Sequence, residues 1–155
     1  MLSATAKPLR PLFVALLAAG LFACGDAPTP PEEALRAWVA AGQQRAEAKD
    51  RSGLMDMVSS DYADARGNDR DAIEQLFMLY FLRANNIKLL TSIEDVRVFS
   101  DSAGEIDLQV VMAATHGGVL GFSGDIYNFE LELVRDGDDW LLIAGRWGAA
   151  GEEMR

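Results

Sequence analysis

Five polar side chains are of the types that enzymes use to move protons: Asp61, Tyr62, Tyr80, His116 and Tyr127. His116 is the only histidine, and its ordinary pKa near neutrality suits a general base. It precedes Gly117 and Gly118, a pair that is more typical of an exposed loop. The tyrosines stand among apolar neighbours, where rings usually fill a core and keep the hydroxyl at its rim. We therefore assign no catalytic residue from the sequence.

A group of polar residues between positions 61 and 71 could hold a metal ion. Its members are Asp61, Asp64, Asn68, Asp69 and Asp71. A calcium loop needs oxygen ligands at alternating positions, and Ala63 and Ala65 occupy two of them. Helix capping and a solvated turn account for the group better. One cysteine and one histidine also exclude thiolate zinc and multi-histidine sites, so we predict neither a metal nor a cofactor.

The first 23 residues have the layout of a secretion signal. Lys7 and Arg10 give a positive start, and an apolar run follows from Leu12 to Ala23. A membrane span needs about 20 residues, whereas the apolar core of a signal peptide has about 7–15. Residues 1–23 are therefore predicted to be a signal peptide and not a spanning helix.

Cys24, the only cysteine, follows this run in the stretch LFACG. The stretch resembles the lipobox of bacterial lipoproteins, which implies a diacylglyceryl thioether on Cys24 and usually a further acyl chain on its amino group. Several acyl chains anchor a protein stably to a membrane. Gly25, and not aspartate, comes next, so the resemblance implies the outer membrane, with the protein facing the periplasm. An ordinary signal peptide with an incidental cysteine is the alternative.

Residues 24–31 comprise this cysteine and a proline-rich tether with a reach of roughly 20 Å, since extended proline-rich chains rise about 3.1 Å per residue. The chain has 14 basic and 24 acidic residues, and Lys7 and Arg10 lie in the signal peptide. The remainder therefore carries about −12 at pH 7. Such a charge repels phosphate backbones, so we predict no nucleic-acid partner.

Three helices are expected between residues 32 and 83. The first carries an apolar stripe at helical spacing, formed by Leu35, Trp38, Val39, Gly42 and Ala46. A capping box of Thr29 and Glu32 is expected to start it. We interpret Trp38 as a core residue, with a ligand platform as the alternative. Asp50 is expected to cap a short second helix.

The third helix is expected to run from Asn68 or Asp69 to about Arg83. Its middle, residues 76–82, is apolar on every side, which is typical of a helix buried on more than one face. We expect one side of this helix to meet the sheet. The other side would meet the first helix or a second subunit.

The second half of the chain alternates apolar and polar residues with the period of β-strands. One strand is expected at residues 87–99, with a bulge near 92–95, and a second around 106–114. Residues 125–147 predict a hairpin in which Asp136 and Gly137 supply the positive φ angles of its turn. Trp140 is expected in the core.

This order of elements resembles the nuclear transport factor 2-like superfamily. The residues that carry the resemblance are 54–62, 70–73, and 136–140 with Trp147. The resemblance implies an α+β fold over residues 32–150, in which three helices pack on a strongly curved antiparallel sheet as a cone-shaped α+β barrel with a cavity at its open end. It also implies a possible homodimer through the sheet. The superfamily includes isomerases, dehydratases, ligand binders and protein-interaction domains.

The family cone makes five residues candidates for lining the cavity: Trp38, Tyr62, Tyr80, His116 and Tyr127. Our leading interpretation is a lipid-anchored, periplasm-facing module that binds a protein partner or a small apolar ligand without catalysis. The alternatives are an acid–base enzyme of isomerase or dehydratase type and a structural envelope module with a filled cavity. An Asp–Tyr or Asp–His pair inside the cone would favour the enzyme.

Overall fold

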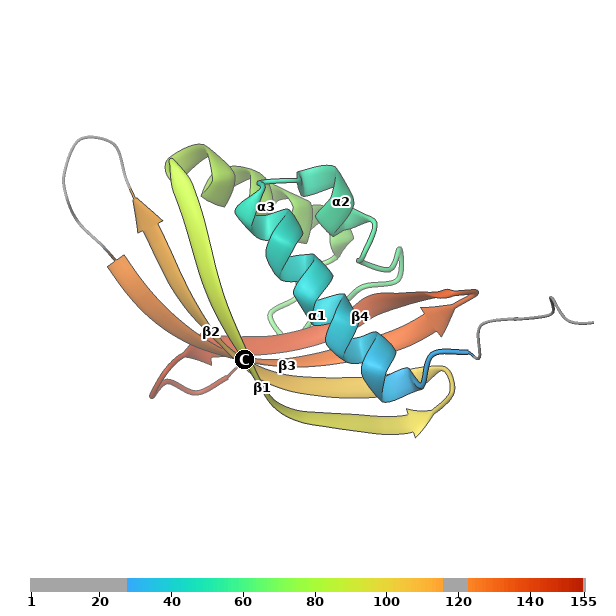
Figure 1. Cartoon of the computed structure of the whole chain (residues 1–155). Coiled ribbons are helices and arrows are strands. Elements are labelled where there is room, and N and C mark those ends of the chain that lie inside the picture. The colour runs from blue at the N-terminus through green and yellow to red at the C-terminus, as the bar shows by residue number, and fades with distance from the viewer. Residues whose placement is uncertain (1–27, 116–122, 155) are drawn as a thin grey trace, which may run out of the picture.

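The computed structural model describes residues 28–115 and 123–154, which form three helices and four strands (Figure 1). The helices are α1 (Pro31–Glu47), α2 (Arg51–Met55) and α3 (Arg70–Arg83). The strands are β1 (Asn86–Ser100), β2 (Ala103–Thr115), β3 (Ser123–Asp136) and β4 (Asp139–Ala149). The predicted α+β class, with helices packed on a curved antiparallel sheet, is confirmed. The four-stranded sheet is open and does not close into a barrel.

Side chains start two of the helices as predicted. The Asp50 carboxylate accepts a hydrogen bond from the Gly53 N–H (2.9 Å), and the Asp69 carboxylate accepts one from the Ala72 N–H (2.9 Å). The capping box expected for α1 is wrong, because Pro30 occupies the N-cap position and offers no side-chain acceptor. Prolines suit the start of a helix without a cap, since their fixed φ matches the first turn.

The strands form an antiparallel meander in the order β1-β2-β3-β4. The β1–β2 register slips at Glu94, within the segment where a bulge was predicted. In the β3–β4 hairpin Asp136 pairs with Asp139, so the two turn residues are Gly137 and Asp138. Only Gly137 has a positive φ, of 60°. The turn therefore lies one residue later than predicted, with glycine at its first central position.

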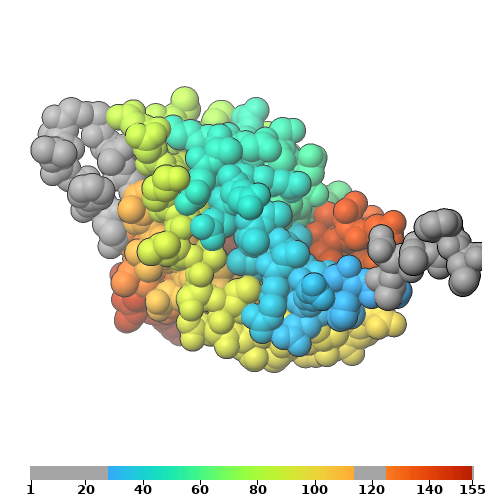
Figure 2. All heavy atoms as spheres, in the orientation of Figure 1, coloured from blue at the N-terminus to red at the C-terminus, as the bar shows by residue number. Residues whose placement is uncertain are grey.

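The core lies between α1 and the concave face of the sheet, and α1 lies flush beside β1 in the space-filling view (Figure 2). Leu35 of α1 is fully buried here. It fits because Gly104 of β2 has no side chain, and a Cβ at that position would lie 2.7 Å from Leu35 Cδ1. Trp140, only 6% exposed, belongs to this core as predicted. The remaining buried members are Val39, Ile106, Leu108, Val110 and Leu133.

Both edges of the sheet are covered in part. On β1 the Leu89 N–H donates to the Glu47 carboxylate (2.9 Å), and the Leu89 carbonyl accepts from the Gln43 amide (2.9 Å). On β4 the Leu142 N–H and carbonyl bond to the backbone of the segment after α2, at 2.9 Å each. Uncovered edge strands invite pairing with other chains. These contacts cover each edge near the beginning of its strand.

Helix α3 differs from the prediction. Ile73 is its one buried residue, while Leu76, Met78, Leu79 and Leu82 are 46%, 39%, 46% and 76% exposed. The expected burial of residues 76–82 on two faces is wrong, because α1 occupies the concave face of the sheet. Helix α3 instead packs through one side only, against the segment around α2 and side chains of β1 and β4.

Two groups of predictions lie outside the described residues. The first is the signal peptide with Cys24 and the start of the tether, and the second is His116. Within residues 28–115 and 123–154, no helix is both long enough and apolar enough to cross a membrane.

Candidate functional site

The four described cavity candidates lie in two separate places. Trp38 of α1 packs against the main core, and Tyr127 of β3 pairs with the buried Val110, so both belong to the concave side of the sheet. Tyr80 of α3 packs beside Phe81, Ala84 and Ile87, and the charges of Asp125 and Tyr127 on β3 raise the pKa of its hydroxyl. Tyr62 lies elsewhere, in a cluster with residues of α2, α3 and β4. Among the described candidates, the structure therefore links Tyr80 with Tyr127 and places Trp38 on the same side of the sheet.

Tyr80 is the best-placed hydrogen-bond donor of this group. Burial of the ring, the nearby charge of Asp125 and the neighbouring Tyr127 all raise the pKa of the Tyr80 hydroxyl above its ordinary value. Since an ordinary tyrosine already titrates near pH 10, this phenol is neutral at physiological pH. It can donate a hydrogen bond to a ligand oxygen, but it is a poor proton acceptor.

Asp125 is a site residue that the sequence reasoning missed. It stands two positions before Tyr127 on β3, so the two side chains share the concave face. Its pairing with Met112, which packs against the core, agrees with this placement. The period-two spacing from Tyr127 was the signal that could have identified it.

Trp38 supplies a second donor on the concave side. Its indole Nε1 is buried and has no hydrogen-bond acceptor among the residues that the structure describes. Buried indole N–H groups normally have a partner, because leaving one unpaired costs free energy. The group is therefore suited to a bound acceptor, such as a carbonyl or hydroxyl oxygen. The tilted rings of Tyr127 and Phe129, with centroids 6.4 Å apart and an angle of 48° between their planes, extend the aromatic surface on β3.

Tyr62 and Asp64 form the tyrosine–carboxylate pair whose geometry is best defined, but its role is structural. The Tyr62 hydroxyl donates to Asp64 Oδ2 (3.1 Å) from a ring that is only 3% exposed. Burial and the charge of Asp64 raise the pKa of Tyr62. Asp64 also accepts bonds from the Arg66 N–H and from the backbone and side-chain N–H groups of Asn68, at 2.8–2.9 Å. A carboxylate with four donors is not free to act as a base.

The connector around Asp64 is fastened to β4. Arg66 donates from Nη2 to the Trp147 carbonyl (2.6 Å), and its guanidinium carbon lies 4.5 Å from the centroid of the Trp147 ring. Two of the carboxylates considered as calcium ligands have structural roles. Asp64 accepts the hydrogen bonds that hold the turn, and Asp69 caps the start of α3. In the part of the chain that the structure covers, no three histidine, cysteine or acidic side chains group as a metal site.

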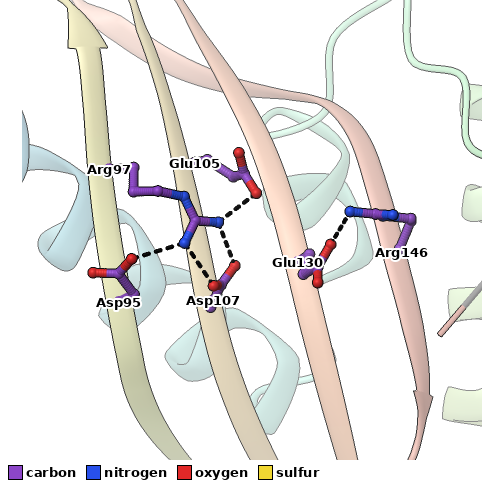
Figure 3. Close-up of polar contacts among 6 residues, drawn as sticks. All are labelled: Asp95, Arg97, Glu105, Asp107, Glu130 and Arg146. Atoms are coloured by element: carbon purple, nitrogen blue, oxygen red, sulfur yellow. Dashed lines mark hydrogen bonds and ion pairs between the residues drawn. The ribbon is translucent and has the colours of Figure 1, made fainter. Parts of the chain in front are cut away.

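The convex face of the sheet, away from α1, carries ion pairs (Figure 3). Arg97 of β1 bonds to Asp107 through both terminal nitrogens (2.8 and 2.9 Å), to Asp95 (2.7 Å) and to Glu105. These hydrogen bonds raise the pKa of the Arg97 guanidinium. On the same face, Arg146 of β4 pairs with Glu130 of β3. The arginines of this face are thus matched by carboxylates of the same face.

Comparison with known proteins identifies the fold. No protein-family model and no curated protein matches the sequence. A crystal structure of a ketosteroid isomerase-like protein from Erwinia carotovora atroseptica superposes with a TM-score of 0.65 at 10% identity, over 80% of this chain and 99% of that one. The chain has the fold of structures described as nuclear transport factor 2-like, so the expected resemblance is confirmed at the level of the fold.

Two further structures with this fold show how widely it is shared. A nuclear transport factor 2-like protein with a cystatin-like fold from Novosphingobium aromaticivorans has a TM-score of 0.65 at 16% identity, covering 79% of this chain and 84% of that one. An uncharacterised cystatin-like protein from Caulobacter vibrioides has a TM-score of 0.62 at 13% identity, covering 77% and 89%. Identities this low establish the shared nuclear transport factor 2-like fold and assign no activity.

Proposed function

We propose that this protein is a lipid-anchored module of the bacterial cell envelope, facing the periplasm, that binds a small apolar molecule without catalysing a reaction. The ligand would lie on the concave side of the sheet, between α1, α3 and β3. It would carry at least one oxygen acceptor. Cys24, in its lipobox-like setting, would hold the domain at the outer membrane through its acyl chains.

The observation that carries the ligand proposal is the buried Trp38 N–H, for which residues 28–115 and 123–154 offer no acceptor. A purely structural core would fill this position with a paired or apolar group, because an unpaired buried donor costs about 1–3 kcal/mol. The neutral Tyr80 phenol adds a second donor, and the rings of Tyr127 and Phe129 add apolar contact area. Two hydrogen-bond donors on an aromatic surface suit a carbonyl-bearing apolar ligand.

Titration with the neutral naphthalene ketone prodan, whose emission shifts to the blue in apolar surroundings, tests this proposal. The full chain should bind prodan. Tyr80→Phe, which removes only the hydroxyl, and Trp38→Phe, which removes the N–H and keeps a smaller aromatic ring, should each weaken binding about 2- to 10-fold, the value of one hydrogen bond. Tyr62→Phe is the matched control, since it removes a hydroxyl outside the site, and should leave binding unchanged. Binding that is absent, or equal in all variants, would refute the proposal.

The membrane anchor has an independent test. Replacement of Cys24 by serine should remove the acyl mass from the N-terminal peptide and shift the protein out of the membrane fraction. An unchanged membrane fraction, or an N-terminal peptide without acyl mass in the wild type, would contradict the lipoprotein proposal. The ligand proposal would be unaffected by either result.

An acid–base enzyme is the second candidate, and one observation favours it. Asp125 shares the concave face of β3 with Tyr127, and its charge raises the pKa of the Tyr80 hydroxyl, so a carboxylate and a phenol are available on this side of the sheet. Such a pair could move a proton on a bound ketone. If prodan-like ketones with an exchangeable α-hydrogen exchange it faster with wild type than with Asp125→Asn, the protein is an enzyme and the non-catalytic proposal is wrong.

A further inference from the structure

The start of α1 marks the end of the domain that lies nearest to the proposed lipid anchor. Leu35 of α1 contacts Gly104 of β2, just after the turn between β1 and β2. The Ser102 carbonyl in this turn accepts a hydrogen bond from the Arg135 N–H, just before the turn between β3 and β4 (2.9 Å). The start of α1 and both hairpin turns therefore lie together at one end of the domain, which we call the anchor-side end (Figure 1).

Exposed carboxylates make the anchor-side end acidic. Among the described residues of the first turn of α1 and the two hairpin turns, six carboxylates are exposed: Glu32, Glu33, Asp101, Asp136, Asp138 and Asp139. Two arginines lie beside them. Arg36 is 2.9 Å from the Glu32 carboxylate, and Arg135 is 3.7 Å from the Asp138 carboxylate. The carboxylates outnumber these arginines by four, so this end is negative at neutral pH.

We propose that these carboxylates hold the domain off the membrane, so that the candidate ligand site faces the periplasm. This inference rests on the proposed acylation of Cys24, from which a tether with a reach of roughly 20 Å leads to α1. A leaflet that contains anionic phospholipids repels the anchor-side end and so favours an extended tether. Since this reach exceeds the Debye length of about 8 Å at physiological ionic strength, extension of the tether removes most of the repulsion.

The repulsion is larger than the apolar attraction at the same end. A basic residue near an anionic leaflet strengthens binding about fivefold, and a carboxylate weakens it by a similar factor. An excess of four carboxylates therefore opposes contact by about 600-fold. Val98 and Phe99, beside the β1–β2 turn, are 41% and 64% exposed, and burial of their exposed parts favours contact by about 15- to 200-fold. The net preference is for a domain that stands away from the leaflet.

The candidate ligand site lies toward the opposite end of the sheet. Tyr127 pairs with Val110 and Asp125 pairs with Met112, and both partners lie well beyond Gly104 on β2. At about 3.3 Å per residue along the strand, these positions are roughly 20–26 Å from Gly104. A domain held off by its anchor-side end therefore keeps the site further still from the leaflet. The ligand then reaches the site through water and does not pass directly from the bilayer.

Energy transfer to the membrane from labels at three positions tests this arrangement. The mature, acylated protein is reconstituted in vesicles of phosphatidylethanolamine with a quarter of phosphatidylglycerol and a trace of rhodamine-labelled lipid. Acylation occupies the only native cysteine, so an introduced cysteine is the only free thiol. Exposed positions for the donor dye are Ala37→Cys at the anchor-side end, Asn85→Cys between α3 and β1, and Gln75→Cys on α3. Transfer should be strongest from Ala37→Cys.

Two substitutions with the same change of charge test the role of the carboxylates. Asp101→Lys acts in the β1–β2 turn, and Glu152→Lys acts just beyond the end of β4, away from the hairpin turns; both native side chains are exposed. Asp101→Lys should shift the contact equilibrium about 25-fold toward the membrane and so increase transfer from Ala37→Cys. Glu152→Lys, the control, should leave that transfer unchanged. In vesicles of phosphatidylcholine alone, Asp101→Lys and wild type should give equal transfer, because this leaflet carries no net charge.

Three results would overturn the inference. Transfer that is equal from the three labels, or strongest from Gln75→Cys, would show that the domain lies on the leaflet, although the lipid anchor would stand. An Asp101→Lys protein that responds no more than the control would remove the electrostatic cause. An N-terminal peptide without acyl mass would overturn the anchor and this inference together.

Discussion

Removal of the Asp64 carboxylate should destabilise the fold far from the proposed ligand site. Asp64 accepts four hydrogen bonds that shape the connector between α2 and α3, and Tyr62 is one of the donors. Asp64→Ala leaves the Tyr62 hydroxyl without this acceptor in a setting where the ring is almost fully buried. Four bonds with a net value of about 0.5–1.5 kcal/mol each give an expected loss of about 2–6 kcal/mol in the free energy of unfolding.

The loss of stability in Asp64→Ala should also depend on pH, in a direction that follows from the pKa of Asp64. Burial opposes ionisation of Asp64, but the hydrogen bonds from Asn68, Tyr62 and Arg66 outweigh it and lower the pKa of the carboxyl. A carboxyl whose pKa is lower in the folded state stabilises the protein above its unfolded pKa of about 3.9. That contribution disappears as the pH falls through the folded pKa. The difference between wild type and Asp64→Ala should therefore be full at pH 7 and shrink below about pH 4.

Urea unfolding at pH 7 and at pH 3, followed by circular dichroism, measures both quantities. Asp61→Ala is the matched control, since Asp61 is an exposed carboxylate of the same connector. Its change should stay within about 0.5 kcal/mol, as is usual for surface substitutions. An Asp64→Ala loss no larger than that of the control, or one that persists undiminished at pH 3, would refute the structural role of Asp64.

Three further predictions concern the packing of the fold. Trp140→Ala should cost about 3–5 kcal/mol, and a change near zero in urea unfolding would show that the hairpin faces water. Gly104→Ala should cost about 1–3 kcal/mol, because the added carbon meets the fully buried Leu35; an unchanged melting temperature would contradict that close contact. Lys49 donates to the Ala84 and Phe81 carbonyls at the end of α3, so Lys49→Met should cost about 0.3–1 kcal/mol and speed hydrogen exchange there, and unchanged exchange would refute the cap.

The sheet could be predicted because its signals are local. Alternation over Ile106–Ala114 and Tyr127–Leu133 places side chains on two faces, and both strands appear where the pattern put them. Gly137 likewise needed only its own conformational freedom to mark the hairpin. These inferences do not depend on what packs against the strands.

The environment of α3 could not be predicted, because it depends on which helix covers the sheet. Residues 76–82 are apolar all round, and periodicity cannot distinguish a helix buried on two sides from one with an uncovered apolar face. Leu35 of α1 fits closely against Gly104 of β2, and this contact places α1 on the concave face. The sequence of α3 contains no signal of that contact, because neither residue belongs to this helix.

The site was predicted only in part for the same reason. Tyr80 and Tyr127 could be named by residue type, but their approach joins α3 to β3 across 47 positions of sequence. Asp125 was missed although it shares the face of Tyr127. The unpaired Trp38 N–H is visible only once α1 is docked.

Native mass spectrometry of the protein isolated from the envelope of its own host tests the central claim most directly. The mature protein, which begins at Cys24, should carry the mass of one small apolar molecule in addition to its acyl chains, and denaturation should release that molecule. The variant with both Trp38→Phe and Tyr80→Phe should carry much less of it. An equal load in this variant, or no load in either protein, would contradict a ligand held by these two donors.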